Sequence, residues 1–225
     1  MIEYDPMHEA WFDDRDFDFN VDMSCEGDSS DLSLKFKSQA EFWQWYINSN
    51  SDYPRIYTGI GSRKTPDIIL NLFVELGKEL AEMKLILRSG GAPGADSAFE
   101  TGCDLVNGHK RIFLPWKGFN NNKSELFGVS AKCVNIARKI IPGFDNRKYG
   151  AQLLTARNVY QVIGNSLQEP TDFIVCYCNG TGGTSNTLKI AKHFGIKHIF
   201  NYYDYLNNLN EVKRLVLDYA IKKNN

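Results

Sequence analysis

Residues Arg88–Glu100 decide the fold of this chain, and their sequence is RSGGAPGADSAFE. The apolar segment Leu85–Leu87 before them has the length of a strand, and the residues after them favour a helix through Asp104. A strand, a glycine-rich turn and a helix in this order can hold a phosphate, because glycines let the backbone approach the anion and the first helical N–H groups point at it. The glycine spacing fits neither G-x-G-x-x-G nor the Walker A pattern, so neither of those motifs is present.

Two further stretches have the same layout. Residues Asn179–Thr187, with the sequence NGTGGTSNT, follow the apolar run Phe173–Tyr177 and precede a helix over Thr187–Phe194. Residues Thr58–Arg63, with the sequence TGIGSR, follow a short strand at Arg55–Tyr57. The carboxyl ends of parallel strands open at one edge of a sheet, where ligands bind in α/β proteins. A single glycine turn is also explained by tight loop geometry, but the three together predict a shared binding edge.

Strand-like and helix-like segments alternate over residues 53–225, which we predict to form one nucleotide-binding domain. Strands are predicted at Arg55–Tyr57, Leu85–Leu87, Arg111–Pro115, Phe173–Tyr177 and Lys197–Asn201. Helices are predicted at Pro66–Met83, from the Gly90 turn to Asp104, at 129–138, Leu153–Ile163, Thr187–Phe194 and Leu209–Lys222. This alternation predicts an α/β fold of the Rossmann-like, doubly wound kind, with a mainly parallel sheet and helices on both faces.

Residues 1–52 are predicted to be an acidic, aromatic N-terminal extension. Residues 1–31 contain eleven acidic residues and one basic residue, a net charge of −10, while the remainder of the chain carries +9. The extension is either a partly disordered tail or, given its aromatic residues, a docking segment. Ser38 and Glu41 form a candidate capping box for a short helix over Gln39–Asn48. The basic body attracts phosphate-bearing ligands, and the acidic leader would compete with them.

The composition excludes several classes of protein. No apolar run approaches the roughly 20 residues that a membrane helix needs, and an acidic N-terminus is not a secretory signal peptide. The five cysteines are scattered and lack a CxxC pair, which favours reduced thiols in a cytoplasmic protein. Cys176 and Cys178 alternate along a predicted strand, and we interpret them as small buried residues rather than metal ligands. Neither a metal nor a cofactor is expected.

These motifs, in this order, resemble the SLOG superfamily of Rossmann-like domains, named after the Smf/DprA and LOG proteins. Arg88–Asp96 is similar to the R-S-G-G-A-x-G-A-D stretch of DprA-like members found in phage and bacterial genomes. Ala156–Gly164 is similar to their A-R-N-V-x-Q-V-x-G helix, and Pro170–Ile174 to their P-x-D-F-V strand. The resemblance covers about residues 53–202. It implies a nucleotide or nucleotide-derived ligand at the glycine turns.

Relatives in the superfamily have different activities. They include mediators of recombination that bind single-stranded DNA, LOG hydrolases that cleave nucleotides, and sensors of NAD-derived signals. The LOG motif P-G-G-x-G-T-x-x-E ends in a catalytic Glu, and that position falls on Thr187 in this chain. The resemblance therefore implies binding rather than hydrolysis of the LOG type.

The turns supply candidate site residues of two kinds. Arg63 is preferred over Arg88 as a phosphate contact, because Arg88 has a core carboxylate as its alternative partner. Asp96 and Glu100 are the candidate catalytic carboxylates, although a helix cap is the favoured role for Asp96. The predicted ligand-binding residues are Gly61, Ser62, Arg63, Ser89, Gly90, Gly91, Gly94, Asp96, Thr181, Gly182, Gly183 and Thr184.

Two other groups of residues have less certain roles. Trp116 and Phe119, in a loop with Lys117 and Lys123, either stack on a base or anchor the loop. Arg157 and Asn158 lie on the helix that the resemblance places near the cleft.

Three functions are compatible with these features. The first is binding of a small nucleotide-type ligand, such as an ADP-ribose-like molecule or a cyclic nucleotide. The second is binding of single-stranded DNA in an electrostatic groove with stacking residues. The third is cleavage of an N-glycosidic bond by Asp96 or Glu100. The sequence indicates no membrane partner and leaves open a homo-oligomer.

Overall fold

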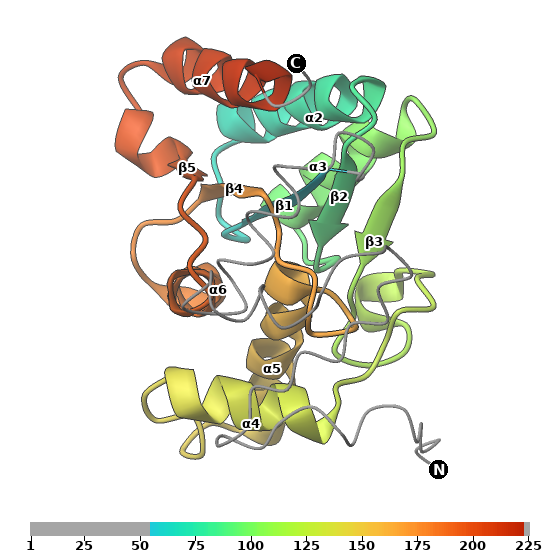
Figure 1. The fold of residues 1–225 in the computed structure, drawn as a ribbon, viewed down its shortest axis with the longest axis vertical. Helices are drawn as coiled ribbons and strands as arrows, with labels where there is room; N and C mark the ends of the chain where they lie inside the picture. Colours follow the sequence, from blue (N-terminus) through green and yellow to red (C-terminus); the bar gives the residue numbers. More distant parts are fainter. Residues whose placement is uncertain (1–54, 223–225) are drawn as a thin grey trace, which may run out of the picture. The chain divides into compact units, whose positions relative to one another are not determined.

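A computed structural model describes residues 55–222 of the chain. Over these residues the chain forms a five-stranded sheet with the order β3-β2-β1-β4-β5, in which all neighbouring strands are parallel (Figure 1). The strands are β1 Ile56–Gly61, β2 Ile86–Ser89, β3 Lys110–Ile112, β4 Phe173–Tyr177 and β5 Ile199–Asn201. The helices are α2 Asp67–Glu82, α3 Ala95–Asp104, α4 Ala131–Ile140, α5 Tyr149–Ile163, α6 Gly182–His193 and α7 Leu209–Lys222, with short 3₁₀ helices at Phe119–Asn121 and Tyr202–Tyr205.

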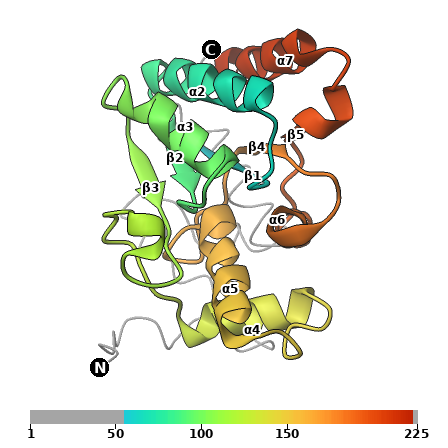
Figure 2. The ribbon, with the colours of Figure 1, turned by 180° about the vertical axis from the view of Figure 1, so that it is seen from behind.

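Helices cover both faces of the sheet, as the sequence predicts. One buried cluster joins α2, α3 and α7 to β1, β2 and β4 through residues such as Phe73, Phe99 and Phe173. A second cluster joins α4, α5 and α6 to the opposite face through residues such as Val159 and Ile174. Figures 1 and 2 show α2 and α7 side by side at one end of the domain and α4 and α5 at the other. The fold is therefore Rossmann-like and doubly wound, which confirms the predicted fold class.

The glycine-rich turns begin and end at different residues from those predicted. The stretch from Thr58 to Gly61 belongs to β1 rather than to a turn, where Gly59 is paired with Val175 of β4. A Cβ atom at Gly59 would approach the Phe99 ring to 2.6 Å, so this glycine serves packing of α3 on the sheet. Helix α6 begins at Gly182, five residues before the predicted start at Thr187. Its glycines therefore form the first helical turn and not a loop before it.

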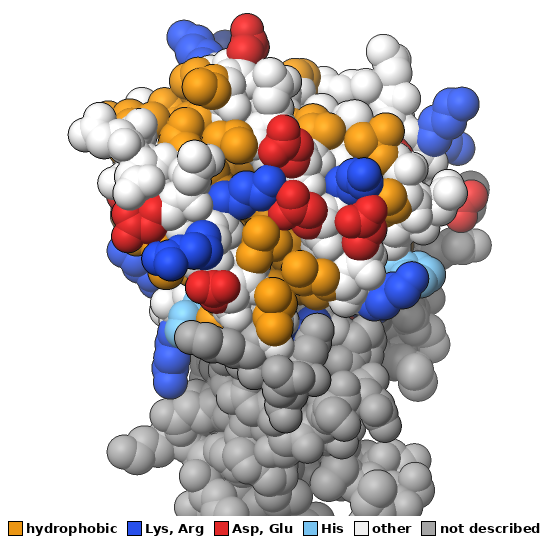
Figure 3. Space-filling view, turned by 90° about the horizontal axis from the view of Figure 1, so that it is seen from above, with side chains coloured by type: hydrophobic (Ala, Val, Ile, Leu, Met, Phe, Trp, Pro, Cys, Tyr) orange, Lys and Arg blue, Asp and Glu red, His pale blue; other side chains and the backbone are white. Residues whose placement is uncertain are grey.

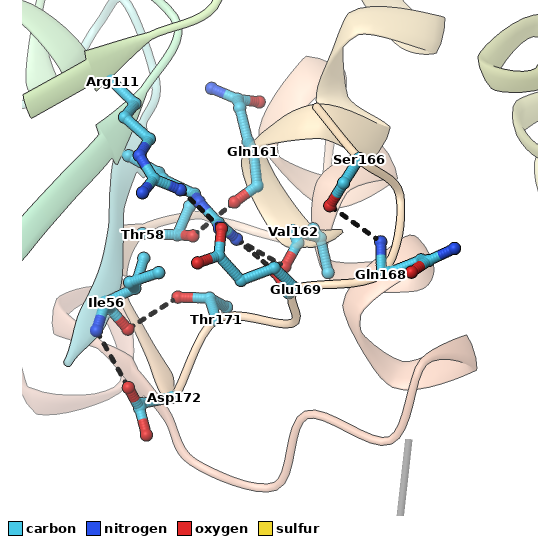
Figure 4. A network of polar contacts seen from close by, with 11 residues as sticks. Ile56, Thr58, Arg111, Gln161, Val162, Ser166, Gln168, Glu169, Thr171 and Asp172 are labelled. Atoms are coloured by element: carbon cyan, nitrogen blue, oxygen red, sulfur yellow. Dashed lines mark hydrogen bonds and ion pairs between the residues drawn. The ribbon is translucent and has the colours of Figure 1, made fainter. Parts of the chain in front are cut away.

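A network of hydrogen bonds and ion pairs, which we call the Arg88 network, connects the sheet to the end of α5 and the loop that follows it (Figure 4). Arg88 of β2 is fully buried and donates to the carboxylate and the carbonyl oxygen of Glu169, in the loop between α5 and β4. Arg111 of β3 donates to the same carboxylate. Nearby, the Thr58 hydroxyl donates to the carbonyl oxygen of Gln161 over 2.6 Å. The core carboxylate considered as the alternative partner of Arg88 is thus Glu169.

Several predictions concern residues that lie outside the described part of the chain. Residues 1–54 and 223–225 belong to this group, so the N-terminal extension and its short helix stay predictions. Within residues 55–222, no helix is both long and apolar enough to cross a membrane, and no three His, Cys, Asp or Glu residues are grouped to hold a metal. Cys176 and Cys178 are buried, as predicted, and both are free thiols.

Candidate functional site

A cleft of about 580 Å³ lies where β1 and β4 end side by side. β2 and β3 lie on one side of β1 in the sheet, whereas β4 and β5 lie on its other side. In open α/β folds, ligands bind at such a point, where the strand order reverses. The volume falls within the range of small-molecule sites. The cleft is lined by the end of β1 and the following loop, by α5, and by the end of β4 with the start of α6. Its lining residues are Ile60, Gly61, Ser62, Arg63, Lys64, Ala92, Asp96, Phe119, Leu154, Thr155, Arg157, Asn158, Gln161, Tyr177, Cys178, Asn179, Thr181, Gly182, Gly183, Thr184 and Thr187.

The N-terminus of α6 is open toward solvent in this cleft. Its N-cap residue, Thr181, makes no side-chain capping hydrogen bond, so the first N–H groups of the helix keep their capacity to donate. A Cβ atom at Gly183 would meet no protein atom within 4 Å. The Asn158 amide and the Thr187 hydroxyl both donate to the Gly183 carbonyl oxygen, over 3.3 and 3.4 Å. The Gly183 carbonyl oxygen is thus hydrogen-bonded within the protein, while the first N–H groups of α6 stay accessible from the cleft.

A buried arginine occupies the floor of the cleft. Arg157 of α5 is only 4% exposed and donates to the Phe113 carbonyl oxygen over 3.0 Å, while its Nε has no hydrogen-bond partner among the described residues. Gly90 makes room for this side chain, because a Cβ atom there would lie 1.4 Å from its Nη1. Burial lowers the pKa of Arg157 to about 10; the charge of Asp96 opposes this shift and that of Arg63 adds to it. Arg157 and Arg63 are thus near enough to repel each other, which favours an anion between them.

Asp96 connects two of the glycine turns rather than capping its helix. The N-cap of α3 is Gly94, and the Asp96 carboxylate accepts the Gly61 N–H of β1 over 3.1 Å. Burial raises the pKa of Asp96 to about 6, although Arg157 and the backbone N–H groups of Gly61, Ala92 and Gly90 pull it down. The predicted role of Asp96 as the cap of α3 is therefore wrong. A cap needs the position before the first turn, whereas Asp96 lies inside that turn and reaches across to β1.

Eight of the twelve predicted ligand-binding residues line the cleft, and four do not. The four are Ser89, Gly90, Gly91 and Gly94. The Ser89 hydroxyl donates to the Gly59 carbonyl oxygen over 2.7 Å. A Cβ atom at Gly94, whose φ is 91°, would lie 2.7 Å from the Ser62 carbonyl oxygen. Ser89 and Gly94 thus hold the segment after β2 close to β1 and to the loop that follows β1. The other eight are Gly61, Ser62, Arg63, Asp96, Thr181, Gly182, Gly183 and Thr184.

The other candidate carboxylate, Glu100, points elsewhere. It pairs with Lys110 over 2.8 Å and accepts a hydrogen bond from the Asn122 amide over 2.9 Å, and it is not among the lining residues. Thr187, at the position of the LOG glutamate, is buried in the wall of the cleft. Among the lining residues, all of them within the described part of the chain, Asp96 is the only carboxylate.

The aromatic loop after β3 reaches the cleft through one residue. Phe119 lines the cleft and is 8% exposed, while Trp116 packs edge-on against it with the ring centroids 5.1 Å apart. Trp116 itself is 41% exposed, and Lys117 lies 5.7 Å from the centre of the exposed Phe127 ring. Phe119 thus anchors the loop in the wall of the cleft, while Trp116 leaves part of its ring exposed to solvent.

Several lining residues were not predicted from the sequence. They include Lys64, Leu154, Thr155, Gln161 and Tyr177. A signal for those on α5 was present, because Arg157, Asn158 and Gln161 are polar residues buried in a largely apolar helix. Buried polar groups need partners, so such a stripe indicates a polar cleft or a hydrogen-bond network.

Comparisons with known proteins give a likeness of fold alone. No family model and no curated protein matches the chain. Among solved structures, DNA processing protein A from Helicobacter pylori, described with its mode of binding single-stranded DNA, is similar over 75% of this chain and 82% of its own, with 15% identity and a TM-score of 0.47. DNA processing protein A from Streptococcus pneumoniae is similar over 75% of this chain and 57% of its own, with 17% identity and a TM-score of 0.45. The chain is thus similar to these DprA structures in the arrangement of its strands and helices.

Proposed function

We propose that the cleft binds a nucleotide or nucleotide-derived ligand through its phosphate, at the N-terminus of α6. The observation that carries this proposal is the open space in front of Gly183. Gly183 has no positive φ and no neighbour that would exclude a side chain. The position leaves room for a ligand to approach the backbone closely, which a Cβ atom would obstruct.

The charges around this space support the same ligand. Arg63, Lys64 and Arg157 line the cleft against the single carboxylate of Asp96. The Arg157 guanidinium donates to a single protein acceptor, the Phe113 carbonyl oxygen, so it keeps further donors for a ligand. A phosphate between the helix start and the two guanidinium groups meets these donors with acceptors.

Binding is better supported than hydrolysis. Removal of a base from a nucleotide needs a carboxylate aligned with the anomeric carbon, and Asp96 is already engaged by backbone N–H groups. If the chain were a hydrolase that uses this residue, base would be released from nucleotides by the parent protein and not by Asp96→Asn.

Two glycines allow a matched test. Gly183 and Gly150 both lie in the first turn of a helix, and a Cβ atom would meet nothing at either position. Titration calorimetry of the full chain with a panel that includes ADP-ribose, AMP and cyclic AMP should show binding. Gly183→Ala should weaken it about tenfold, since the methyl group obstructs the phosphate, and Gly150→Ala should leave it unchanged. The proposal fails if no member of the panel binds, or if the two variants behave alike.

Single-stranded DNA is a second candidate ligand. The exposed Trp116 beside Phe119, with Lys117 next to it, offers a stacking surface and a cation at the edge of the cleft. Base stacking on aromatic side chains and a basic groove are the usual means of holding a single strand. Trp116→Ala should then weaken binding of an oligonucleotide and leave binding of ADP-ribose unchanged.

A further inference from the structure

The side-chain amide of Gln161 is a buried polar group in the wall of the cleft. Gln161 lies on α5 and is only 2% exposed. Among residues 55–222 its amide makes no hydrogen bond, although it offers two donors and an acceptor. The amide is not fully enclosed by protein atoms, as the Nε of Arg157 is, so a ligand in the cleft can reach it. Because buried polar groups in native proteins are almost always hydrogen-bonded, this amide indicates a partner that enters the cleft.

The backbone of Gln161 is fixed independently of its side chain. Its carbonyl oxygen accepts the hydroxyl of Thr58 on β1 over 2.6 Å. Figure 4 shows this carbonyl oxygen facing Thr58 and the side-chain amide pointing the opposite way. The amide therefore takes no part in the Arg88 network, and its position is set before a ligand binds.

Two hydrogen-bond donors lie side by side next to Gly90. A Cβ atom at Gly90 would lie 1.4 Å from Nη1 of Arg157 and 2.5 Å from Nε2 of Gln161, so these two nitrogens are neighbours. Nη1 of Arg157 uses one hydrogen for the Phe113 carbonyl oxygen and keeps the other. A carbonyl oxygen has two lone pairs and can accept from both nitrogens. The Oε1 atom of Gln161 is an acceptor beside them, so the complementary ligand group is a carbonyl next to an N–H.

The amide lies close to the proposed phosphate site. Asn158, three residues earlier on α5, donates to the Gly183 carbonyl oxygen of α6, and three residues advance a helix by about 4.5 Å. Phe119 lines the same cleft, and its loop is tied to the turn after β2 because Asn120 donates to the Gly91 carbonyl oxygen over 2.9 Å. The Phe119 ring gives this end of the cleft an apolar wall for a flat base. A nucleotide with its phosphate at α6 can therefore place its base against the amide.

Another hollow, of about 490 Å³, shows what an ordinary polar surface looks like. It lies between α2 and the segment before α7, at the end of the domain that Figure 3 shows, where acidic and basic side chains lie among apolar ones. Lys213 pairs there with Glu75 and Glu79. The polar side chains that line this hollow are all exposed: Asn71, Glu75, Asn207, Asn208 and Asn210. Water satisfies exposed amides, so these need no ligand, in contrast to the buried amide in the cleft.

We propose that Gln161 selects the base of the bound nucleotide, and that the preferred base carries a carbonyl group next to a ring N–H. Hypoxanthine, guanine and uracil have this edge. Adenine and cytosine have an amino group in place of the carbonyl, and the neighbouring ring nitrogen carries no hydrogen. The base carbonyl accepts from Gln161 and Arg157, and the ring N–H donates to Oε1 of Gln161. The proposal rests on the proposed function, because the phosphate at α6 brings the base to the amide; adenine nucleotides still bind through that phosphate, but less tightly.

Two pairs of nucleotides test this selection. Inosine monophosphate (IMP) and AMP differ only at this edge, and UMP and CMP differ in the same way on a smaller ring. Titration calorimetry of the full chain should give a Kd about tenfold lower for IMP than for AMP, within the range that a bidentate Gln contact contributes. Gln161→Met keeps the length of the side chain without its amide and should bind IMP and AMP equally. The control Gln168→Met removes an amide in the loop after α5, outside the cleft lining, and should keep the preference of the parent.

Other outcomes separate this proposal from the proposed function. A preference for IMP alone assigns the edge to purines, and a preference for UMP over CMP alone assigns it to pyrimidines. Equal binding within both pairs, or tighter binding of AMP than of IMP, overturns the selection while the cleft still binds nucleotides. A preference that persists in Gln161→Met, or a loss of both nucleotides in that variant, also overturns it, because the amide would then not read the base. If no nucleotide binds to the parent, the proposed function fails first.

Discussion

Arg88 and Arg157 are both buried, but their surroundings are opposite. Arg88 is enclosed by acceptors, because the Glu169 carboxylate and carbonyl oxygens lie against it and Arg111 completes the group. Arg157 donates to one carbonyl oxygen and lines the cleft. The first arrangement pairs the buried charge with a carboxylate of the protein and stabilises the fold. The second places a charged side chain in the wall of a cleft, so a buried charge is informative about function only after its partners have been identified.

The largest expected effect tests the stabilising role of the Arg88 network. Glu169→Ala leaves Arg88 buried without its carboxylate, and we expect the free energy of unfolding to fall by about 3–5 kcal/mol. Glu82→Ala, which removes the partner of the exposed Lys78, should cost less than about 0.5 kcal/mol. Urea unfolding of both variants measures the difference. Equal losses would show that the network contributes no more than a surface pair.

The next effect concerns the pH dependence of the cleft. The pKa of Asp96 is about 6 in the folded chain, against an ordinary value of 3.8. Its contribution to stability is therefore fully present below about pH 4 and is lost as the pH rises through 6. Asp96→Asn removes this titration, so its stability relative to the parent should improve by roughly 3 kcal/mol between pH 4 and pH 7. Unfolding curves of both proteins from pH 4 to pH 7 measure how the difference in their free energies of unfolding changes with pH. A difference that stays constant would contradict the raised pKa of Asp96.

A third prediction tests the role of Arg157 in the cleft. Arg157→Met keeps the volume of the side chain and removes its charge. Nucleotide affinity should fall roughly 30-fold, about 2 kcal/mol. At pH 5, where Asp96 with a pKa of about 6 is mostly protonated, stability should change by about 1 kcal/mol at most, the value of the hydrogen bond to Phe113. Calorimetry and urea unfolding on the same preparation give both quantities. A loss of stability as large as that of Glu169→Ala, with affinity retained, would place Arg157 in the same class as Arg88.

The smallest effect is expected at the exposed cation. Arg63 lies at the rim of the cleft in an exposed position, where solvent and salt screen its charge. Arg63→Ala should reduce nucleotide affinity about fivefold, and the reduction should shrink as salt is raised. A loss equal to that of Arg157→Met at every salt concentration would mean that the two arginines contact the ligand equally.

The sequence predicts the sheet well because the signals for strands are local. Phe173–Tyr177 is a buried apolar run, and its predicted bounds agree with β4. The glycine turns were predicted less well, since glycine serves both packing and ligand approach. Gly59 and Gly90 make room for Phe99 and Arg157, residues of other elements that no local pattern identifies.

The carboxylates show the same limit. Asp96 is a preferred capping residue in the right part of a helix, yet it accepts from Gly61, thirty-five residues away. Glu100 lies one turn further along α3 and pairs with Lys110 on the far side. Which of the two faces the cleft depends on how α3 packs on β1, and that is a tertiary property. The stretch Arg88–Glu100 thus predicts a binding edge without identifying which of its residues reach the ligand.

The central claim is that the start of α6 holds a phosphate, and amide chemical shifts test it most directly. ADP-ribose added to the ¹⁵N-labelled full chain should shift the amide resonances of Gly183 and Thr184 most, with smaller changes at the Arg63 amide. Adenosine, which lacks the phosphates, should shift them little. Large shifts confined to α2 and α7, or equal shifts at Gly183 with both compounds, would contradict the account.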